Sequence, residues 1–146
     1  MSNLNTVLQR VADIAKQAGI SGDIHPQPGY FVAGFELPEQ RSQIVYVRPK
    51  AGVEDHSLIT VFSPCHVFKR GFLSGIGKSQ CIELLQLNEK QPFARFGMWD
   101  DGKEQMIVAS VDHLLETLDP SELRSAMWYV AMAADQYEKQ HGKDDF

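Results

Sequence analysis

The chain reads ELLQLN at residues 83–88, FARFGMW at 93–99, DDGK at 100–103 and QMIVAS at 105–110. The first segment carries apolar residues at helical spacing, whereas the second and fourth are rich in residues typical of strands. An Asp-Gly pair between two such segments is typical of a tight hairpin turn. These residues therefore predict a helix followed by a two-stranded antiparallel hairpin.

Upstream, residues 4–18 predict an amphipathic helix. Apolar side chains recur there every three or four positions, and polar side chains occupy the other side. Gly19 follows the last of them, where a left-handed helix cap is least costly for glycine, and Pro26 and Pro28 prevent an early return to helix. The helix is expected to end near Ala18.

Three segments after this helix predict an antiparallel meander. They span residues 30–37, 43–48 and 57–63 and are rich in β-branched or aromatic residues, with Pro38 and Pro49 bounding the first two. The more apolar face of the first strand consists of Phe31, Ala33, Phe35 and Leu37. We expect this face to meet the helices.

The middle helix, predicted over residues 78–89, is apolar around more than half of its circumference. Its apolar side chains are Cys81, Ile82, Leu84, Leu85 and Leu87. One core-facing stripe does not need so many. Either the helix is buried inside the monomer, or part of its surface contacts another protein.

The last helix has a clear start signal at Asp119-Pro120-Ser121-Glu122, which supplies an N-cap, a first-turn proline and an acid three residues after the cap. Its main apolar stripe consists of Leu123, Ala126, Met127, Val130, Ala134 and Tyr137. Trp128 and Met132 form a second, smaller ridge on the other side. This ridge is either covered by the Leu114-Leu115 segment or contacts a second subunit or client.

Together these elements predict an α+β fold, in which an antiparallel sheet with the order α-β-β-β-α-β-β-α carries helices packed on it. The length of 146 residues and the hydrophobic fraction of 43% suit a single domain over residues 1–146. No apolar segment is long enough to span a bilayer and the N-terminus lacks signal-peptide features, so we expect a cytoplasmic protein. Cys65 and Cys81 are then free thiols.

Composition argues against nucleic-acid binding, because that function depends on clustered Lys and Arg while this chain has a net charge of -5. Lys69, Arg70 and Lys78 offer at most a small anion patch, and a solvated loop explains them more simply. The glycine-rich residues 71–79 fail as a Walker A motif, since five residues rather than four separate Gly71 from the Gly-Lys-Ser. A flexible loop that ends in a Ser cap accounts for them.

Other chemical motifs are also incomplete. Cys65 and His66 are adjacent in a strand, so their side chains are expected on opposite faces, and no second ligand pair accompanies them for zinc. The remaining histidines are scattered at positions 25, 56, 113 and 141. Acidic residues 100, 101, 104 and 112 surround a hairpin, where turn formation is the simpler role. We therefore expect no catalytic residue, cofactor or metal. A hydrolase becomes tenable only if His66 or His113 lies beside Cys65 or Cys81 in a cleft.

This element order resembles the YbjN-like family, which shares the type III secretion chaperone-like fold with the Tir-chaperone group. The residues that carry the resemblance are Leu84-Leu85 ahead of Asn88, Phe93 to Phe96, the acidic-Gly turn, and Ala133-Ala134-Asp135-Gln136-Tyr137. The resemblance implies helices packed on an antiparallel sheet, a homodimer, and binding or regulation of other proteins without catalysis. It transfers no specific client.

The sequence thus favours a non-catalytic protein-binding module, chaperone-like or regulatory, that acts as a homodimer and binds a protein client. The candidate interface residues are Leu84, Leu87, Trp99, Trp128 and Met132. A sensory domain that binds a small ligand between sheet and helices is the alternative.

Overall fold

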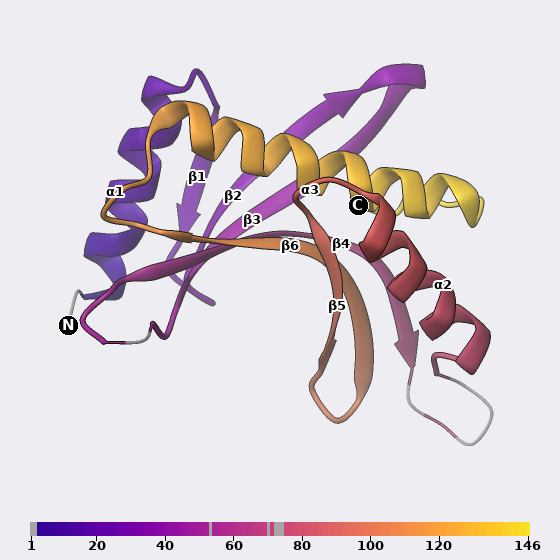
Figure 1. The fold of residues 1–146 in the computed structure, drawn as a ribbon. Coiled ribbons are helices and arrows are strands. Elements are labelled where there is room, and N and C mark those ends of the chain that lie inside the picture. Colours follow the sequence, from indigo (N-terminus) through magenta and orange to yellow (C-terminus); the bar gives the residue numbers. More distant parts are fainter. Residues whose placement is uncertain (1–2, 53, 70, 72–74) are drawn as a thin grey trace.

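The computed structural model describes residues 3–52, 54–69, 71 and 75–146. Within them the predicted order of helices and strands is confirmed, and one short strand is added ahead of the three expected before the middle helix (Figure 1). In chain order the elements are α1 (Leu4–Gln17), β1 (Gly22–His25), β2 (Tyr30–Leu37), β3 (Arg41–Lys50), β4 (Leu58–Lys69), α2 (Lys78–Lys90), β5 (Arg95–Asp100), β6 (Glu104–Leu114) and α3 (Pro120–Gln140).

The strands form one antiparallel sheet in the order β1-β2-β3-β4-β6-β5, which confirms the predicted α+β class. The predicted hairpin is β5–β6, with Trp99 opposite Met106. At its tip, Asp101 Oδ1 accepts hydrogen bonds from the backbone N–H groups of Lys103 and Glu104, both at 2.8 Å. Gly102 has a φ of 88°, which glycine adopts without steric cost.

The hydrophobic core lies between one face of this sheet and the three helices. Alternate residues of the central strands, such as Val45 and Val47 in β3 and Ile59 and Val61 in β4, are fully buried. The predicted stripe of α3 is also buried against them. In Figure 1, α1 and α3 lie across the sheet while α2 stands at its β5 end. The predicted apolar face of β2 turns toward this core through Phe31 and Ala33, and Phe35 packs against it.

Two prolines sit inside strands rather than at their ends. Pro49 belongs to β3, and β4 continues through Pro64 to Lys69, beyond the predicted end at Ser63. The pairing of β4 with β6 shifts register between Pro64 and His66, which marks a β-bulge. Proline cannot donate to the ladder and is tolerated at such irregularities. Gln43 Nε2 donates to the Pro64 carbonyl at 2.7 Å and so satisfies the backbone there.

The helix ends follow the predicted signals. Gly19 has a φ of 74° just after the C-terminus of α1. At the start of α3, Glu122 N–H donates to Asp119 Oδ1 at 2.7 Å, and Asp119 N–H donates to Glu122 Oε2 at 3.0 Å. Both amides belong to the first turn, where no helical carbonyl is available to them. The local sequence alone therefore fixes where α3 begins.

Replacing Asp119 with alanine is expected to lower the free energy of unfolding by about 1 kcal/mol, because the Glu122 amide loses its acceptor. Urea denaturation followed by circular dichroism measures this loss. The control is Ser121→Ala, an exposed first-turn position that should change stability by less than about 0.5 kcal/mol. Equal stability of Asp119→Ala and the unmodified protein would show that the capping bond contributes nothing.

Candidate functional site

Helix α2 exposes most of its apolar surface. Leu85 is 69% exposed and Ile82 is 45% exposed, whereas Leu84 is only 9% exposed and packs into the core. The first interpretation of this helix, burial inside the monomer, is therefore wrong for Ile82 and Leu85. Periodicity shows that a helix is apolar but not what covers each side, which only the packing of α2 against the end of the sheet establishes.

Asn88 fixes α2 to the edge strand β5. Its side chain donates to the Phe96 carbonyl at 3.1 Å and accepts from the Phe96 amide at 2.7 Å. A carboxamide carries both a donor and an acceptor. The Asn88 side chain therefore makes the two hydrogen bonds to Phe96 that the backbone of a neighbouring strand would otherwise make. This pair of bonds holds α2 with Leu84 inward and Leu85 outward.

A second apolar surface lies along α3. A groove of about 490 Å³ is lined by Phe35 of β2 and by Arg124, Ser125, Trp128 and Tyr129 of α3. Trp128 is 44% exposed although Leu115 is buried, so the Leu114-Leu115 segment does not cover it completely. Met132, one turn further along, is half-buried. Of the predicted second ridge, Trp128 is the residue that remains open to a partner.

Trp99 belongs to an aromatic cluster on the face of the sheet that carries no helix. It alternates with the core residue Phe96, and its ring centroid lies 4.5 Å from that of Phe62. The Arg48 guanidinium stacks 4.4 Å from the centre of the Trp99 ring. Tyr30 and Tyr46 extend the cluster across β2 and β3. These neighbours leave Trp99 half-buried. Contacts within the monomer therefore explain why a tryptophan occupies this strand position, and no second protein is needed to cover it.

The five predicted interface residues therefore do not form one surface. Leu84 is buried inside the monomer and is corrected to a core residue, because α2 turns it toward the sheet. Leu87 is partly buried against the same core. Trp99, Trp128 and Met132 lie on separate elements. The predicted set omitted Ile82 and Leu85. Both are apolar residues of a helix that needs only one apolar side, here the side of Leu84, to face the core, so a signal for them was present in the sequence.

A larger hollow lies between α1 and the β1–β2 edge of the sheet. Its volume is about 780 Å³ and its floor includes Ala12, Phe31 and Ala33. Exposed polar side chains surround this floor. They are Gln9, Asp13, Lys16, Asp23 and His25. This hollow offers room for a small ligand between α1 and the sheet.

Cys65 and His66 lie on the same side of the sheet, contrary to the predicted alternation. Cys65 belongs to the core, and the bulge in β4 pairs His66 with the core residue Ile107. The His66 ring also contacts Tyr137 of α3. A bulge adds one residue to a strand and so interrupts the regular alternation of side chains. Local propensity does not reveal such an insertion.

This juxtaposition does not prepare a nucleophile. Cys65 is fully buried, its Sγ lies 3.4 Å from the Ile107 carbonyl, and burial together with the Glu138 charge raises the pKa of the thiol. Burial also lowers the pKa of His66, with Lys143 and His141 contributing. A thiol with a raised pKa stays protonated, and the thiolate is the reactive form. Cys81 is exposed on α2.

The acidic residues near the hairpin have structural roles. Backbone hydrogen bonds from Glu104 and Lys103 lower the pKa of Asp101, as expected of a turn-forming carboxylate. Asp112 accepts from Lys50 at 2.6 Å and from Thr60 at 2.7 Å, which ties β6 to β3 and β4. Both carboxylates are thus used within the sheet and its turn.

The glycine-rich segment is only partly described. Arg70 and residues 72–74 lie outside the described residues, so the anion patch with Lys69 and Lys78 and the whole loop are not tested. Helix α2 begins after Gly77, whose amide donates to Gln80 Oε1 at 2.8 Å. Gln80 rather than the expected serine therefore satisfies this helix start, because its longer side chain reaches back over one turn.

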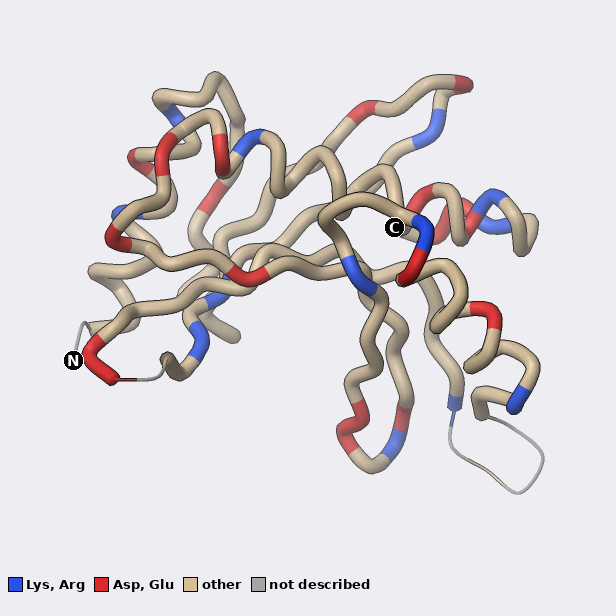
Figure 2. The backbone as a smooth tube through the Cα atoms, in the orientation of Figure 1, with Lys and Arg blue, Asp and Glu red and all other residues tan. Residues whose placement is uncertain are grey.

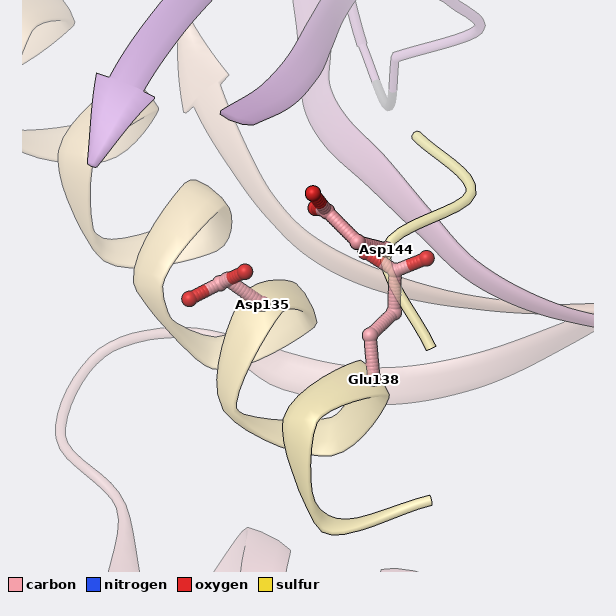
Figure 3. A group of neighbouring side chains, drawn as sticks. All are labelled: Asp135, Glu138 and Asp144. Atoms are coloured by element: carbon pink, nitrogen blue, oxygen red, sulfur yellow. The ribbon is translucent and has the colours of Figure 1, made fainter. Parts of the chain in front are cut away.

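A cluster that sequence reasoning missed joins β3, α3 and the end of the chain. Three carboxylates, those of Asp135, Glu138 and Asp144, lie near one another at the C-terminal end of α3 (Figure 3). Arg41 Nε lies 2.7 Å from Asp135 Oδ1, and Arg41 Nη2 lies 3.8 Å from Asp144 Oδ1. The Arg41 guanidinium thus supplies positive charge beside two of the three carboxylates.

Charge elsewhere is dispersed. Figure 2 shows Lys and Arg interspersed with Asp and Glu along the backbone, without a continuous basic surface among the described residues. This distribution does not match the concentrated positive charge with which proteins bind nucleic acids. Among the described residues, no helix has the length and apolar character needed to cross a lipid bilayer.

Comparison with known proteins finds a likeness in fold. No protein-family model matches the sequence, and no curated protein matches it at a significant level. The structure is similar to the type III secretion chaperone SycH of Yersinia pestis, solved in complex with a stable fragment of YscM2. The TM-score is 0.52 at 13% identity, and the match covers 90% of this chain and 99% of SycH. The chain therefore has the fold of a type III secretion chaperone.

Proposed function

We propose that this chain is a non-catalytic, chaperone-like or regulatory protein-binding module of the YbjN-like type, which acts in the cytoplasm as a homodimer and binds a protein client. The fold likeness supports the chaperone-like part, since SycH was solved with a bound fragment of another protein. The protonated, buried Cys65 thiol supports the absence of catalysis. The observation that carries the proposal is the exposed apolar face of α2.

The homodimer interface is assigned to α2, where a second copy of the chain would bind. Leu85 and Ile82 project from a helix that is already fastened to β5 through Asn88, so this apolar face is rigid before any partner arrives. A preorganised surface loses little conformational entropy on association. Two α2 helices that meet through Leu85 and Ile82 shield these side chains from water in both copies, as an isologous interface requires.

The binding site for the client is assigned to the open edge of β2, away from α2. Strand β1 pairs with residues 30–33 of β2, whereas residues 34–37 have no strand on that side within the described part of the chain. An extended client segment can add a strand along this edge and place an apolar side chain in the groove formed by Phe35 and Trp128. Arg124 at the same groove favours an acidic residue next to that side chain.

Replacing Leu85 with glutamate is expected to weaken self-association at least tenfold, because a carboxylate buried in an apolar interface leaves a charge without a partner. Analytical ultracentrifugation over a dilution series measures the dissociation constant. The matched control is Gln86→Glu, which adds the same charge at the next exposed position of α2. If both variants dimerise like the unmodified protein, the α2 interface is wrong.

Native mass spectrometry of tagged protein from its own cells tests the wider proposal. Twice the chain mass with a stoichiometric polypeptide is expected for a dimer that binds a client. A small added mass without any polypeptide would instead favour the sensory alternative. The specific observation behind that alternative is the 780 Å³ hollow beside α1, with its apolar floor and polar rim.

A further inference from the structure

The last residues of the chain fold back over α3 and form what we call the C-terminal strap, residues 141–146. The Lys143 amide donates to the Glu138 carbonyl at 2.8 Å, and the Asp145 amide donates to Glu138 Oε1 at 2.9 Å. Arg41 Nη2 donates to the Lys143 carbonyl at 2.5 Å. Glu138 of α3, Arg41 of β3 and His66 of β4 thus all contact the strap. Figure 3 shows Asp144 of the strap beside Glu138.

Glu138 is the buried centre of this arrangement. Its exposed fraction is 0%, and its Oε2 atom has no hydrogen-bond partner among the described residues. Burying a carboxylate oxygen without a donor is costly, more so when the group is ionised. A protonated carboxyl group can donate from that oxygen, whereas an ionised one can only accept.

A second buried side-chain oxygen without a donor among the described residues belongs to β3. Gln43 Oε1 of β3 is also buried without a partner in the described structure, and the other end of this amide binds the Pro64 carbonyl. Pro64 precedes Cys65, on which the Glu138 charge acts. Gln43 is thus linked to the Pro64-Cys65 segment by a hydrogen bond, and Glu138 is linked to it by its charge. A proton on Glu138 Oε2 changes that atom from an acceptor without a donor into a donor.

The charges around Glu138 favour the same state. Asp135 on its own helix and Asp144 and Asp145 on the strap are acidic, and Cys65 of β4 is close enough to feel the Glu138 charge. Arg41 of β3 is the opposing cation, and it is already engaged by Asp135 at 2.7 Å. Ionisation of Glu138 adds another negative charge to a group that has one guanidinium.

We propose that Glu138 is protonated when the strap is closed, and that loss of this proton releases the strap from α3. The inference goes beyond the proposed function and concerns the isolated chain. Opening breaks the hydrogen bonds that the backbone amides of Lys143 and Asp145 donate to Glu138. It also exposes the Glu138 carboxylate to water, where its ionised form is stable. The strap is thus a pH-sensitive latch that opens as pH rises.

The direction of the pH effect follows from linkage. Burial, and then the charges of Asp144 and Asp145, raise the pKa of Glu138 despite its bond from the Asp145 amide and the opposing charge of Arg41. The closed strap therefore binds the proton more tightly than the open one. Between the ordinary pKa of a glutamate and the raised one, opening releases up to one proton and becomes up to about tenfold more favourable per pH unit.

Two histidines also change charge with pH, His66 beside the strap and His141 within it. Lys143 Nζ lies 3.1 Å from His66 Nδ1, so protonation of His66 at low pH repels Lys143 and loosens the strap. His141 lies 3.9 Å from Glu83 of α2, and this ion pair forms when the imidazole is charged. A change at Glu138 alone is needed to separate these contributions.

Glu138→Gln provides that change, because glutamine keeps the Oε1 acceptor and places a permanent donor where the carboxyl proton was. The measurement is amide hydrogen exchange at Lys143 and Asp145 by NMR, corrected for the intrinsic pH dependence of exchange, between about pH 5 and about pH 8. Protection of both amides should fall as pH rises in the unmodified protein. Glu138→Gln should lose this fall and keep only the pH dependence that His66 and His141 contribute. The control is Glu39→Gln, an exposed glutamate that pairs with Lys139 of α3 and should leave the pH dependence unchanged.

A second readout keeps the test decisive if Glu138→Gln folds poorly. The ¹³C shift of the Glu138 carboxyl in the unmodified protein reports its protonation directly. A titration well above the ordinary range of glutamate, in step with loss of Asp145 protection, supports the latch. An ordinary titration, or identical pH dependence in Glu138→Gln and the unmodified protein, overturns it.

Discussion

Replacing Arg41 with methionine is expected to lower the free energy of unfolding by about 3–5 kcal/mol, the usual cost of removing one partner from a buried ion pair. The side chains of Arg41 and Asp135 are 16% and 8% exposed, and their contact distance is 2.7 Å. Methionine keeps the length of the arginine stem but leaves the Asp135 carboxylate without its cation. This loss is a large part of the total stability, because the free energy of unfolding of a native protein is only about 5–15 kcal/mol.

Urea denaturation measures the loss, and two further variants identify its cause. Arg41→Met combined with Asp135→Leu should recover much of the stability, since no charge is then left without a partner at that contact. Lys139→Met removes the cation of the exposed Glu39–Lys139 pair, which joins the turn after β2 to α3. This change should have little effect, because solvent screens that pair. If Arg41→Met were as mild as Lys139→Met, the cluster would not hold β3 to α3.

Two substitutions of Tyr137, to alanine and to phenylalanine, are expected to separate what its ring and its hydroxyl group contribute to the free energy of unfolding. The residue is buried, and its ring meets Phe96 of β5 at 5.6 Å, His66 at 6.4 Å and His141 at 4.2 Å between centroids. Tyr137→Ala should cost about 3–5 kcal/mol, because it leaves a large cavity where α3 meets the sheet. Thermal or urea denaturation gives this value.

Tyr137→Phe should instead be neutral or stabilising by about 1 kcal/mol, since it removes a buried hydroxyl group. The hydroxyl has no hydrogen-bond partner within the described residues. Burial raises the pKa of Tyr137 to about 12, so the phenol is neutral and no charge is lost with it. A loss of more than about 1 kcal/mol in Tyr137→Phe would show that the hydroxyl is satisfied in solution.

Several parts of this fold follow directly from short-range sequence signals. The cap at Asp119, the left-handed Gly19 and the Asp101-Gly102 turn lie where they were predicted, because each depends on residues within one turn of the chain. The face of β2 that carries Phe31 was also predicted correctly. Hydrophobic periodicity and local hydrogen bonding are sufficient for such features.

Features that depend on distant contacts were not accessible in this way. The bulge that turns Cys65 and His66 to the same side arises where β4 is paired with β6. Exposure of Leu85 and burial of Leu84 depend on how α2 is held against Phe96. In each case the residue type and spacing are compatible with more than one environment.

The sequence of this protein was enough to define its helices, most of its strands and the order in which they occur, since backbone preferences and apolar periodicity act over a few residues. Tertiary structure alone brings Arg41 to Asp135, which are 94 positions apart, and folds Asp145 back onto Glu138. Interactions of buried charges depend on the solvent and the partners around them, and both are set only when the distant segments pack together.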